Sequence, residues 1–118
     1  MTISGIHHVA ICVPDVEAAT RFYVDVLGFS IRDDRPDFGF PGAWLDIGGQ
    51  QVHLMEVEGS PAPLQHFALQ VDDLDEAVAA VQAKGVTVRR SSHFPGAGHQ
   101  AFLHDPGGNE IELNQPDH

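Results

Sequence analysis

Three histidines and one glutamate occupy equivalent positions of an internal repeat. The segment HVAICV, which begins at His8, matches HFALQV, which begins at His66, and the triplet VHL around His53 matches IEL around Glu112. Imidazole nitrogens and a carboxylate oxygen together suit one divalent ion per site, of the kind Zn²⁺, Ni²⁺, Co²⁺, Fe²⁺ or Mn²⁺. Such an ion polarises a substrate carbonyl or holds two neighbouring substrate oxygens.

Strand periodicity predicts that the two candidate ligands of each half lie on the same face of their sheet. Alternate residues of a β-strand point the same way, and the apolar neighbours of these four form the face that packs under a helix. A single strand histidine is usually an ordinary surface or core residue, but the coincidence across the repeat favours a metal site. Glu112 is the only obvious carboxylate base of the set, so it is also the candidate catalytic residue.

The other histidines are assigned separately. His7 follows the opposite phase to His8 and is predicted to be structural. His104 shares a face with Phe102 and could face a cavity. His93 and His99 belong to a Gly-rich segment, where they are either solvated or at the mouth of a pocket.

Each half of the chain predicts a β-α-β-β-β order of elements. In the first half we expect a strand over 5–13, a helix capped by Asp15 and ended by Gly28, and strands over 29–32, 42–47 and 50–57. In the second we expect a strand over 65–71, a helix over 74–84 capped by Asp72 or Asp73, and strands over 86–90, 99–104 and 109–114. The sequence therefore predicts a single α+β domain over 1–118, with module one at 1–58, a linker at 59–64 and module two at 65–114.

Composition narrows the range of partners and compartments. The net charge of −11 argues against nucleic acid and anionic membrane surfaces as partners, because both need basic patches. Cys12 is the only cysteine, which excludes an internal disulfide and a thiolate-rich zinc site. No secretory signal or long apolar stretch is recognisable, so we expect a cytoplasmic protein.

Two motifs resemble a known family. The opening IHHVAI and RFYVDVLGF, with the closing FLHDPGGNEIEL, are similar to the two ends of vicinal oxygen chelate proteins, which comprise glyoxalase I, bleomycin resistance proteins and extradiol dioxygenases. The resemblance covers nearly the whole chain and points to the glyoxalase-I-like subgroup. It implies that the two modules form a cupped mixed sheet with helices on its outer face. It also implies a homodimer whose sites are shared between chains, each taking His8 and His53 from one chain and His66 and Glu112 from the other.

The family resemblance implies several activities. The first expectation is an enzyme, a metal-dependent lyase or isomerase of the glyoxalase I type, acting on a small carbonyl substrate whose oxygens chelate the metal. The second is an Fe(II) ring-cleaving dioxygenase that uses a subset of the same ligands, and the third is a non-catalytic protein that binds a drug or metabolite. Glyoxalase I usually has an acidic residue where His53 stands, which leaves Glu112 without an equivalent second base.

Overall fold

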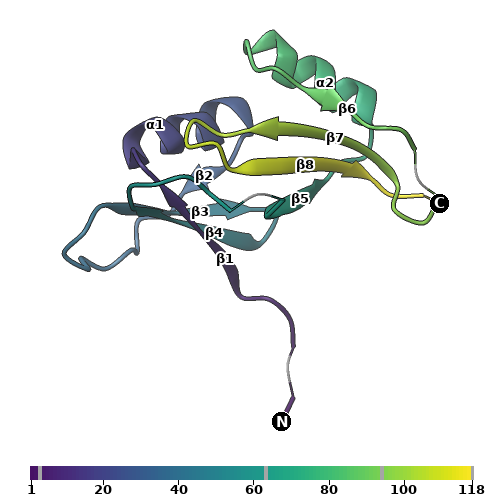
Figure 1. Cartoon of the computed structure of the whole chain (residues 1–118). Coiled ribbons are helices and arrows are strands. Elements are labelled where there is room, and N and C mark those ends of the chain that lie inside the picture. Colours follow the sequence, from purple (N-terminus) through teal and green to yellow (C-terminus); the bar gives the residue numbers. More distant parts are fainter. Residues whose placement is uncertain (3, 63, 94, 118) are drawn as a thin grey trace. The chain divides into compact units, whose positions relative to one another are not determined.

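The computed structural model describes residues 1–118 apart from 3, 63, 94 and 118, and it has two compact units, residues 1–60 and 61–118. The first unit contains β1 (His8–Val13), α1 (Val16–Arg21), the π-helical turn η1 (Phe22–Val26), β2 (Ser30–Ile31), β3 (Gly42–Ile47) and β4 (Gln50–Glu56). The second contains β5 (His66–Gln70), α2 (Leu74–Ala83), β6 (Arg89–Arg90), β7 (His99–His104) and β8 (Glu110–Gln115). The predicted α+β class with tandem βαβββ modules is confirmed (Figure 1).

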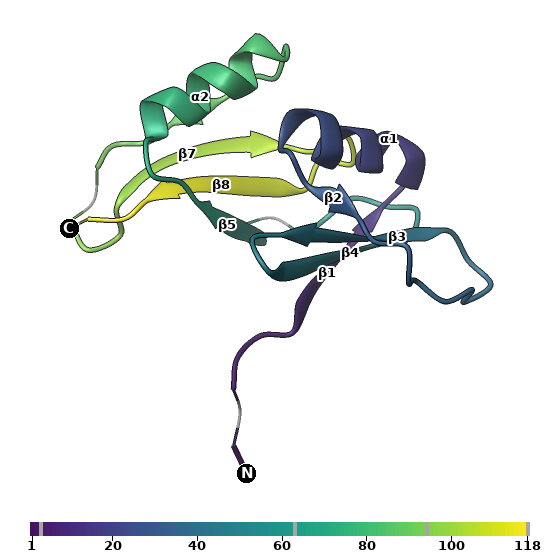
Figure 2. The ribbon, with the colours of Figure 1, turned by 180° about the vertical axis from the view of Figure 1, so that it is seen from behind.

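Each unit has its own mixed four-stranded sheet. The strand orders are β1-β4-β3-β2 and β5-β8-β7-β6, and in both sheets only the first strand pairs in parallel with its neighbour. The helix of each unit covers one face of its own sheet, α1 over β3 and β4 and α2 over β7 and β8 (Figures 1 and 2). The other face carries the side chains predicted to bind metal.

Apolar residues at alternating strand positions form the core between each helix and its sheet. Leu45 and Leu54 are buried in the first unit, and Leu103 and Leu113 are their equivalents in the second. Tyr23, from η1, is completely buried and contributes the largest of these side chains. The same alternation places His53 and Glu112 on the opposite face, where Trp44 and Phe102 are their neighbours.

Both helices begin in the same way, which shows how closely the modules repeat each other. Asp15 accepts a hydrogen bond from the backbone N–H of Ala18, as predicted for an N-cap. The cap of α2 is Asp73 rather than Asp72. A second acceptor comes from the strand that is last in chain order in each unit, β4 or β8. Glu56 Oε2 accepts from the first N–H of α1 at 3.1 Å, and Gln115 Oε1 accepts from the first N–H of α2 at 2.8 Å.

The largest departures from the sequence prediction are at edge strands. The segments 29–32 and 86–90 were expected to be longer strands, but β2 and β6 are only two residues each. Both lie at the open edge of a sheet, and each pairs with its neighbour over only two residues. No helix within the described part of the chain is long and apolar enough to cross a membrane.

Candidate metal centre

The four predicted ligands form two pairs, one in each unit. In the first unit β4 lies between β1 and β3, so that His53 is level with Ala10 on one side and with Trp44 on the other. The His53 ring stacks on both His8, at 4.0 Å between centroids, and Trp44, at 4.3 Å. This three-ring stack holds both imidazoles on the sheet face predicted from strand alternation.

One ring nitrogen of each histidine in the first pair lies beside a polar atom of another side chain. His53 Nε2 lies 2.9 Å from Gln51 Oε1, and His8 Nδ1 lies 2.9 Å from His7 Nδ1. His7, which was predicted to point to the opposite face, thus contacts the His8 ring. His7 precedes β1, so strand alternation does not govern its direction. Burial of His53, followed by the proximity of His8, lowers the pKa of His53 below its ordinary value.

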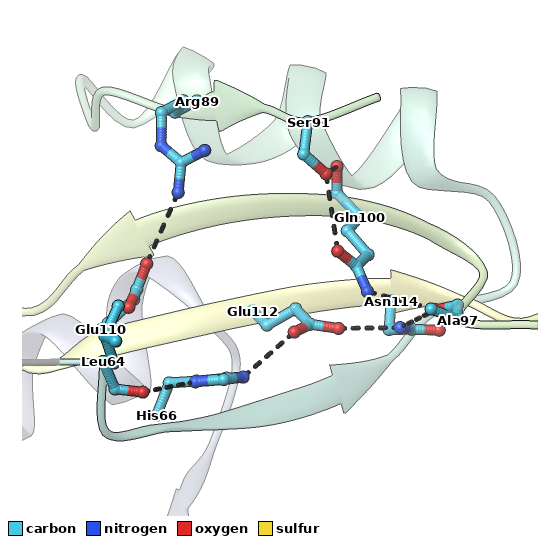
Figure 3. Close-up of polar contacts among 9 residues, drawn as sticks. All are labelled: Leu64, His66, Arg89, Ser91, Ala97, Gln100, Glu110, Glu112 and Asn114. Atoms are coloured by element: carbon cyan, nitrogen blue, oxygen red, sulfur yellow. Dashed lines mark hydrogen bonds and ion pairs between the residues drawn. The ribbon is translucent and has the colours of Figure 1, made fainter. Parts of the chain in front are cut away.

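The second unit pairs His66 with Glu112 at the equivalent strand positions. Glu112 lies between Ala68 of β5 and Phe102 of β7, as His53 lies between Ala10 and Trp44. His66 Nε2 is 3.1 Å from Glu112 Oε1 (Figure 3). This contact places an imidazole nitrogen and a carboxylate oxygen side by side on the face away from α2.

Backbone and side-chain groups orient both members of the second pair. His66 Nδ1 lies 3.0 Å from the carbonyl oxygen of Leu64, and Asn114 Nδ2 donates to Glu112 Oε2 at 2.7 Å (Figure 3). Leu64 has φ 68, and it is the only non-glycine residue with positive φ among those that the structure describes. A strained residue of this kind persists where the surrounding structure requires it, often at a functional site. The Leu64 carbonyl and then the Glu112 carboxylate raise the pKa of His66 above its ordinary value.

The spacing of the second pair fits two ligands of one ion. Bonds of about 2.1 Å to a metal place neighbouring ligand atoms roughly 3.0 to 3.4 Å apart, depending on the bond angle. The observed 3.1 Å between His66 Nε2 and Glu112 Oε1 falls in that range. The bond from His66 Nδ1 to Leu64 matches the outer hydrogen bond that metal-binding histidines usually make. In the first pair, coordination through His53 Nε2 requires that Gln51 release it.

A cavity of about 300 Å³ lies on the side of the second sheet that carries Glu112. Its wall is formed by Val86, Thr87, Arg89, Phe102 and His104. His104 lines it with Phe102, as their shared face predicts. The Arg89 guanidinium carbon is 4.7 Å from the Phe102 ring centroid, and an Arg89 nitrogen is 3.6 Å from Glu110 Oε1. The cavity is thus mainly apolar, with one cationic side chain at its wall.

A further group of metal-competent side chains was missed by sequence reasoning. His93, His99 and Asp117 offer ligand atoms that all lie within 4.8 Å of one another. The sequence prediction left the two histidines open and did not include Asp117. The backbone N–H of Gly96 and then His93 lower the pKa of Asp117. Strand periodicity carries no signal for such a group, because two of its members lie outside strands.

The tandem βαβββ modules define the class of protein to which the chain belongs. The chain belongs to the Glyoxalase/Bleomycin resistance protein/Dioxygenase superfamily, whose model matches residues 5–113.

Individual relatives differ in what they do. Mouse mitochondrial methylmalonyl-CoA epimerase is 30% identical over 131 residues, which cover 96% of this chain and 74% of that protein. A Bacillus anthracis protein classed in the glyoxalase family has a TM-score of 0.88 and 27% identity, covering 99% of this chain and 98% of that one. TnmS3, an antibiotic binding protein from Streptomyces sp. CB03234, has a TM-score of 0.82 and 33% identity, with 99% of both chains covered.

Proposed function

We propose that the chain is a metal-dependent lyase or isomerase of the glyoxalase I type, acting on a small carbonyl compound. His8, His53, His66 and Glu112 would hold one divalent ion. The observation that carries the proposal is the pairing of His66 with Glu112. An imidazole and a buried carboxylate lie 3.1 Å apart, and each is oriented by a hydrogen bond to its other polar atom.

The chemistry is a proton transfer next to a carbonyl group. When bound, the ion would polarise the substrate carbonyl and hold a neighbouring oxygen. Glu112, or a water molecule beside it, takes the proton from the adjacent carbon and returns it to the substrate. Asn114 donates a hydrogen bond to the second oxygen of Glu112, which is buried and lies level with Phe102 of β7. The cavity of about 300 Å³ suits a small substrate.

The complete site is proposed to form in a homodimer, where the first unit of one chain meets the second unit of the other. A complementation experiment tests this arrangement. One chain carries H8A and H53A, and the other carries H66A and E112A. In a heterodimer with shared sites, one site keeps all four ligands and the other keeps none, so the heterodimer is expected to bind about one ion more than either variant homodimer. If sites form within single chains, the heterodimer binds no more metal than either variant homodimer.

Metal content is the first test of the ligand set. Elemental analysis of protein purified without an affinity tag or chelator should show that H8A, H53A, H66A and E112A each lose one equivalent relative to the wild type. H104A is the matched control and should lose none, because His104 lies on the same face outside the ligand set. Full metal content in H66A or E112A would refute the assignment.

Proton transfer is measured independently of the final product. Solvent deuterium should enter the carbon next to the carbonyl of a hemithioacetal or of a 2-methyl-branched acyl thioester. The latter is included because the mouse relative is an epimerase of methylmalonyl-CoA. E112Q should slow the exchange by about 10²- to 10⁴-fold, the usual contribution of a general base. Exchange at the wild-type rate in E112Q would remove Glu112 from the chemistry.

A second candidate function is the binding of a planar aromatic compound without catalysis. Phe38 and Phe40 are exposed, and their rings lie 5.9 Å apart, with Phe38 also 6.1 Å from Trp44. The Phe38 ring is tilted by 47° to Trp44, and the Arg35 guanidinium carbon lies 5.1 Å from the Phe38 centroid and 5.4 Å from the Phe40 centroid. The two rings therefore form a partly exposed aromatic cluster beside the stack of Trp44 and His53, which an aromatic ligand could join. The similarity to TnmS3 supports this reading. Tight binding of a planar dye such as anilinonaphthalene sulfonate to metal-free protein, lost in F38A, would favour it. Metal retention with deuterium exchange would favour the enzyme.

A further inference from the structure

Three segments of the second unit converge on one surface position away from the His66–Glu112 pair. His93 lies in the loop between β6 and β7, His99 begins β7, and Asp117 follows β8. Their ligand atoms lie within 4.8 Å of one another although all three residues are exposed. Two imidazoles and one carboxylate are a common donor set for divalent transition ions.

Hydrogen bonds and ring stacking already hold the three side chains in place. The His93 and His99 rings stack with 4.1 Å between centroids and 18° between planes. His93 Nε2 lies 2.8 Å from Asp117 Oδ1, while Asp117 Oδ2 accepts a hydrogen bond from the backbone N–H of Gly96 at 2.9 Å. One carboxylate oxygen is therefore fixed by the backbone, and the other faces an imidazole nitrogen. A divalent ion can replace the proton shared by His93 and Asp117 once these two atoms move apart from 2.8 Å to the roughly 3.0 to 3.4 Å that separates two ligands of one ion.

We propose that His93, His99 and Asp117 form a second divalent transition-metal site, separate from the His66–Glu112 pair. The ion would have three protein ligands and would complete its coordination with water. It would fasten the C-terminal tail to the loop that carries Gly96 and Ala97. That loop is hydrogen-bonded to β8 of the second sheet, because Asn114 Nδ2 donates to the Ala97 carbonyl at 2.9 Å. The site lies wholly within the second unit, so it needs no other subunit and does not depend on the proposed enzymatic function.

The test uses full-length, tag-free protein in which the other candidate site has been removed. The background variant carries H66A and E112A, and Zn²⁺ or Co²⁺ is titrated by calorimetry and by the absorption of bound Co²⁺. We expect about one ion to bind. Adding H93A or H99A should weaken binding at least tenfold, and D117N should weaken it while preserving the hydrogen bond from Gly96. H104A in the same background is the control and should bind as the background does.

Paramagnetic Co²⁺ gives a second, local readout. It should broaden the amide resonance of Gly96 and the ring resonances of His99, and it should slow proteolysis of the C-terminal tail. The proposal is overturned if the background variant binds no ion, or if binding survives both H93A and H99A. Failure of the glyoxalase-type function would leave these results unchanged, since the background already lacks that site.

Discussion

The His66 imidazole is held between two oxygens, with Nδ1 at 3.0 Å from the Leu64 carbonyl and Nε2 at 3.1 Å from Glu112 Oε1. A carbonyl oxygen only accepts hydrogen bonds, so Nδ1 carries a proton. The neutral tautomer then presents the lone pair of Nε2 beside the carboxylate, which is the arrangement a metal ion requires. Without metal, a second proton on Nε2 forms an ion pair with Glu112.

The first prediction concerns the orientation of Glu112. N114A removes the hydrogen bond that Asn114 donates to Glu112 Oε2 at 2.7 Å. Loss of such an outer partner typically weakens metal binding by about 10- to 100-fold, and we expect that range here by calorimetric titration with Zn²⁺. Q82A, on the exposed surface of α2, is the control and should bind as the wild type does. An unchanged affinity in N114A would mean that Glu112 is oriented by other groups.

The second prediction concerns two histidines whose pKa values are shifted in opposite directions in metal-free protein. The pKa of His66 is raised by the Leu64 carbonyl and the Glu112 carboxylate, whereas burial and His8 lower the pKa of His53. His66 therefore contributes stability below the unfolded pKa of about 6.5, and this contribution is lost as the pH rises through the folded pKa. For His53 the folded state resists protonation, so stability falls as the pH drops through about 6.5 towards the lower folded pKa.

Proton NMR titration with chelator present should resolve the two rings, His66 above and His53 below the ordinary histidine pKa. In E112Q the pKa of His66 should fall, because the carboxylate charge is gone while the Leu64 carbonyl remains. The titration of His53 should be unaffected, which makes it the internal control. Equal pKa values for the two rings in the wild type would contradict the assigned environments.

The sequence predicts the module architecture well, because alternation and helical spacing are strong signals in this chain. The boundaries of β3 and β7 agree with the predicted 42–47 and 99–104, and each is paired on both sides within its sheet. The two-residue edge strands were overestimated, since their length depends on pairing with a single neighbour. The π-helical turn η1 was not anticipated either, because apolar spacing does not distinguish it from a continued α-helix.

The candidate site was only partly readable from sequence. Repeat alignment and strand phase place His8 with His53 and His66 with Glu112 on the helix-free face of their own sheets. The orienting contacts depend on backbone positions and on strand register, so Leu64 and Asn114 were not foreseen as partners. Asp117 was overlooked because a tail residue gains neighbours only through tertiary folding.

The third prediction uses Trp44, the only tryptophan of the chain, as a reporter. Its ring stacks on His53 with 4.3 Å between centroids and 10° between planes. An open-shell ion such as Ni²⁺ or Co²⁺ bound by His53 would lie close to this fluorophore and should quench its emission. H53A should abolish the quenching, whereas H99A should preserve it because His99 belongs to the other unit. Quenching that persists in H53A would show that the ion near Trp44 uses different ligands.

The fourth prediction compares two glycines of the loop before β7. Gly96 and Gly98 have φ +90 and +80, so alanine at either position is strained, by roughly 1–2 kcal/mol. A Cβ at Gly96 meets nothing within 4 Å, whereas at Gly98 it would lie 2.6 Å from the Gln115 carbonyl oxygen and 2.8 Å from Asn114 Oδ1. The backbone at Gln115 cannot move without disturbing the end of β8, which also anchors α2 through the Gln115 side chain.

In urea denaturation, the free energy of unfolding of G96A should therefore fall only by the cost of the backbone strain. That of G98A should fall by about 1–3 kcal/mol more because of the steric conflict. G98A should also weaken metal binding at the His66–Glu112 pair, because Asn114 must shift and its hydrogen bond to Glu112 is disturbed. G96A keeps its N–H and should leave that affinity unchanged, so it is the matched control. Equal losses of stability and affinity in the two variants would show that strain alone, and not the contact with Asn114, governs this loop.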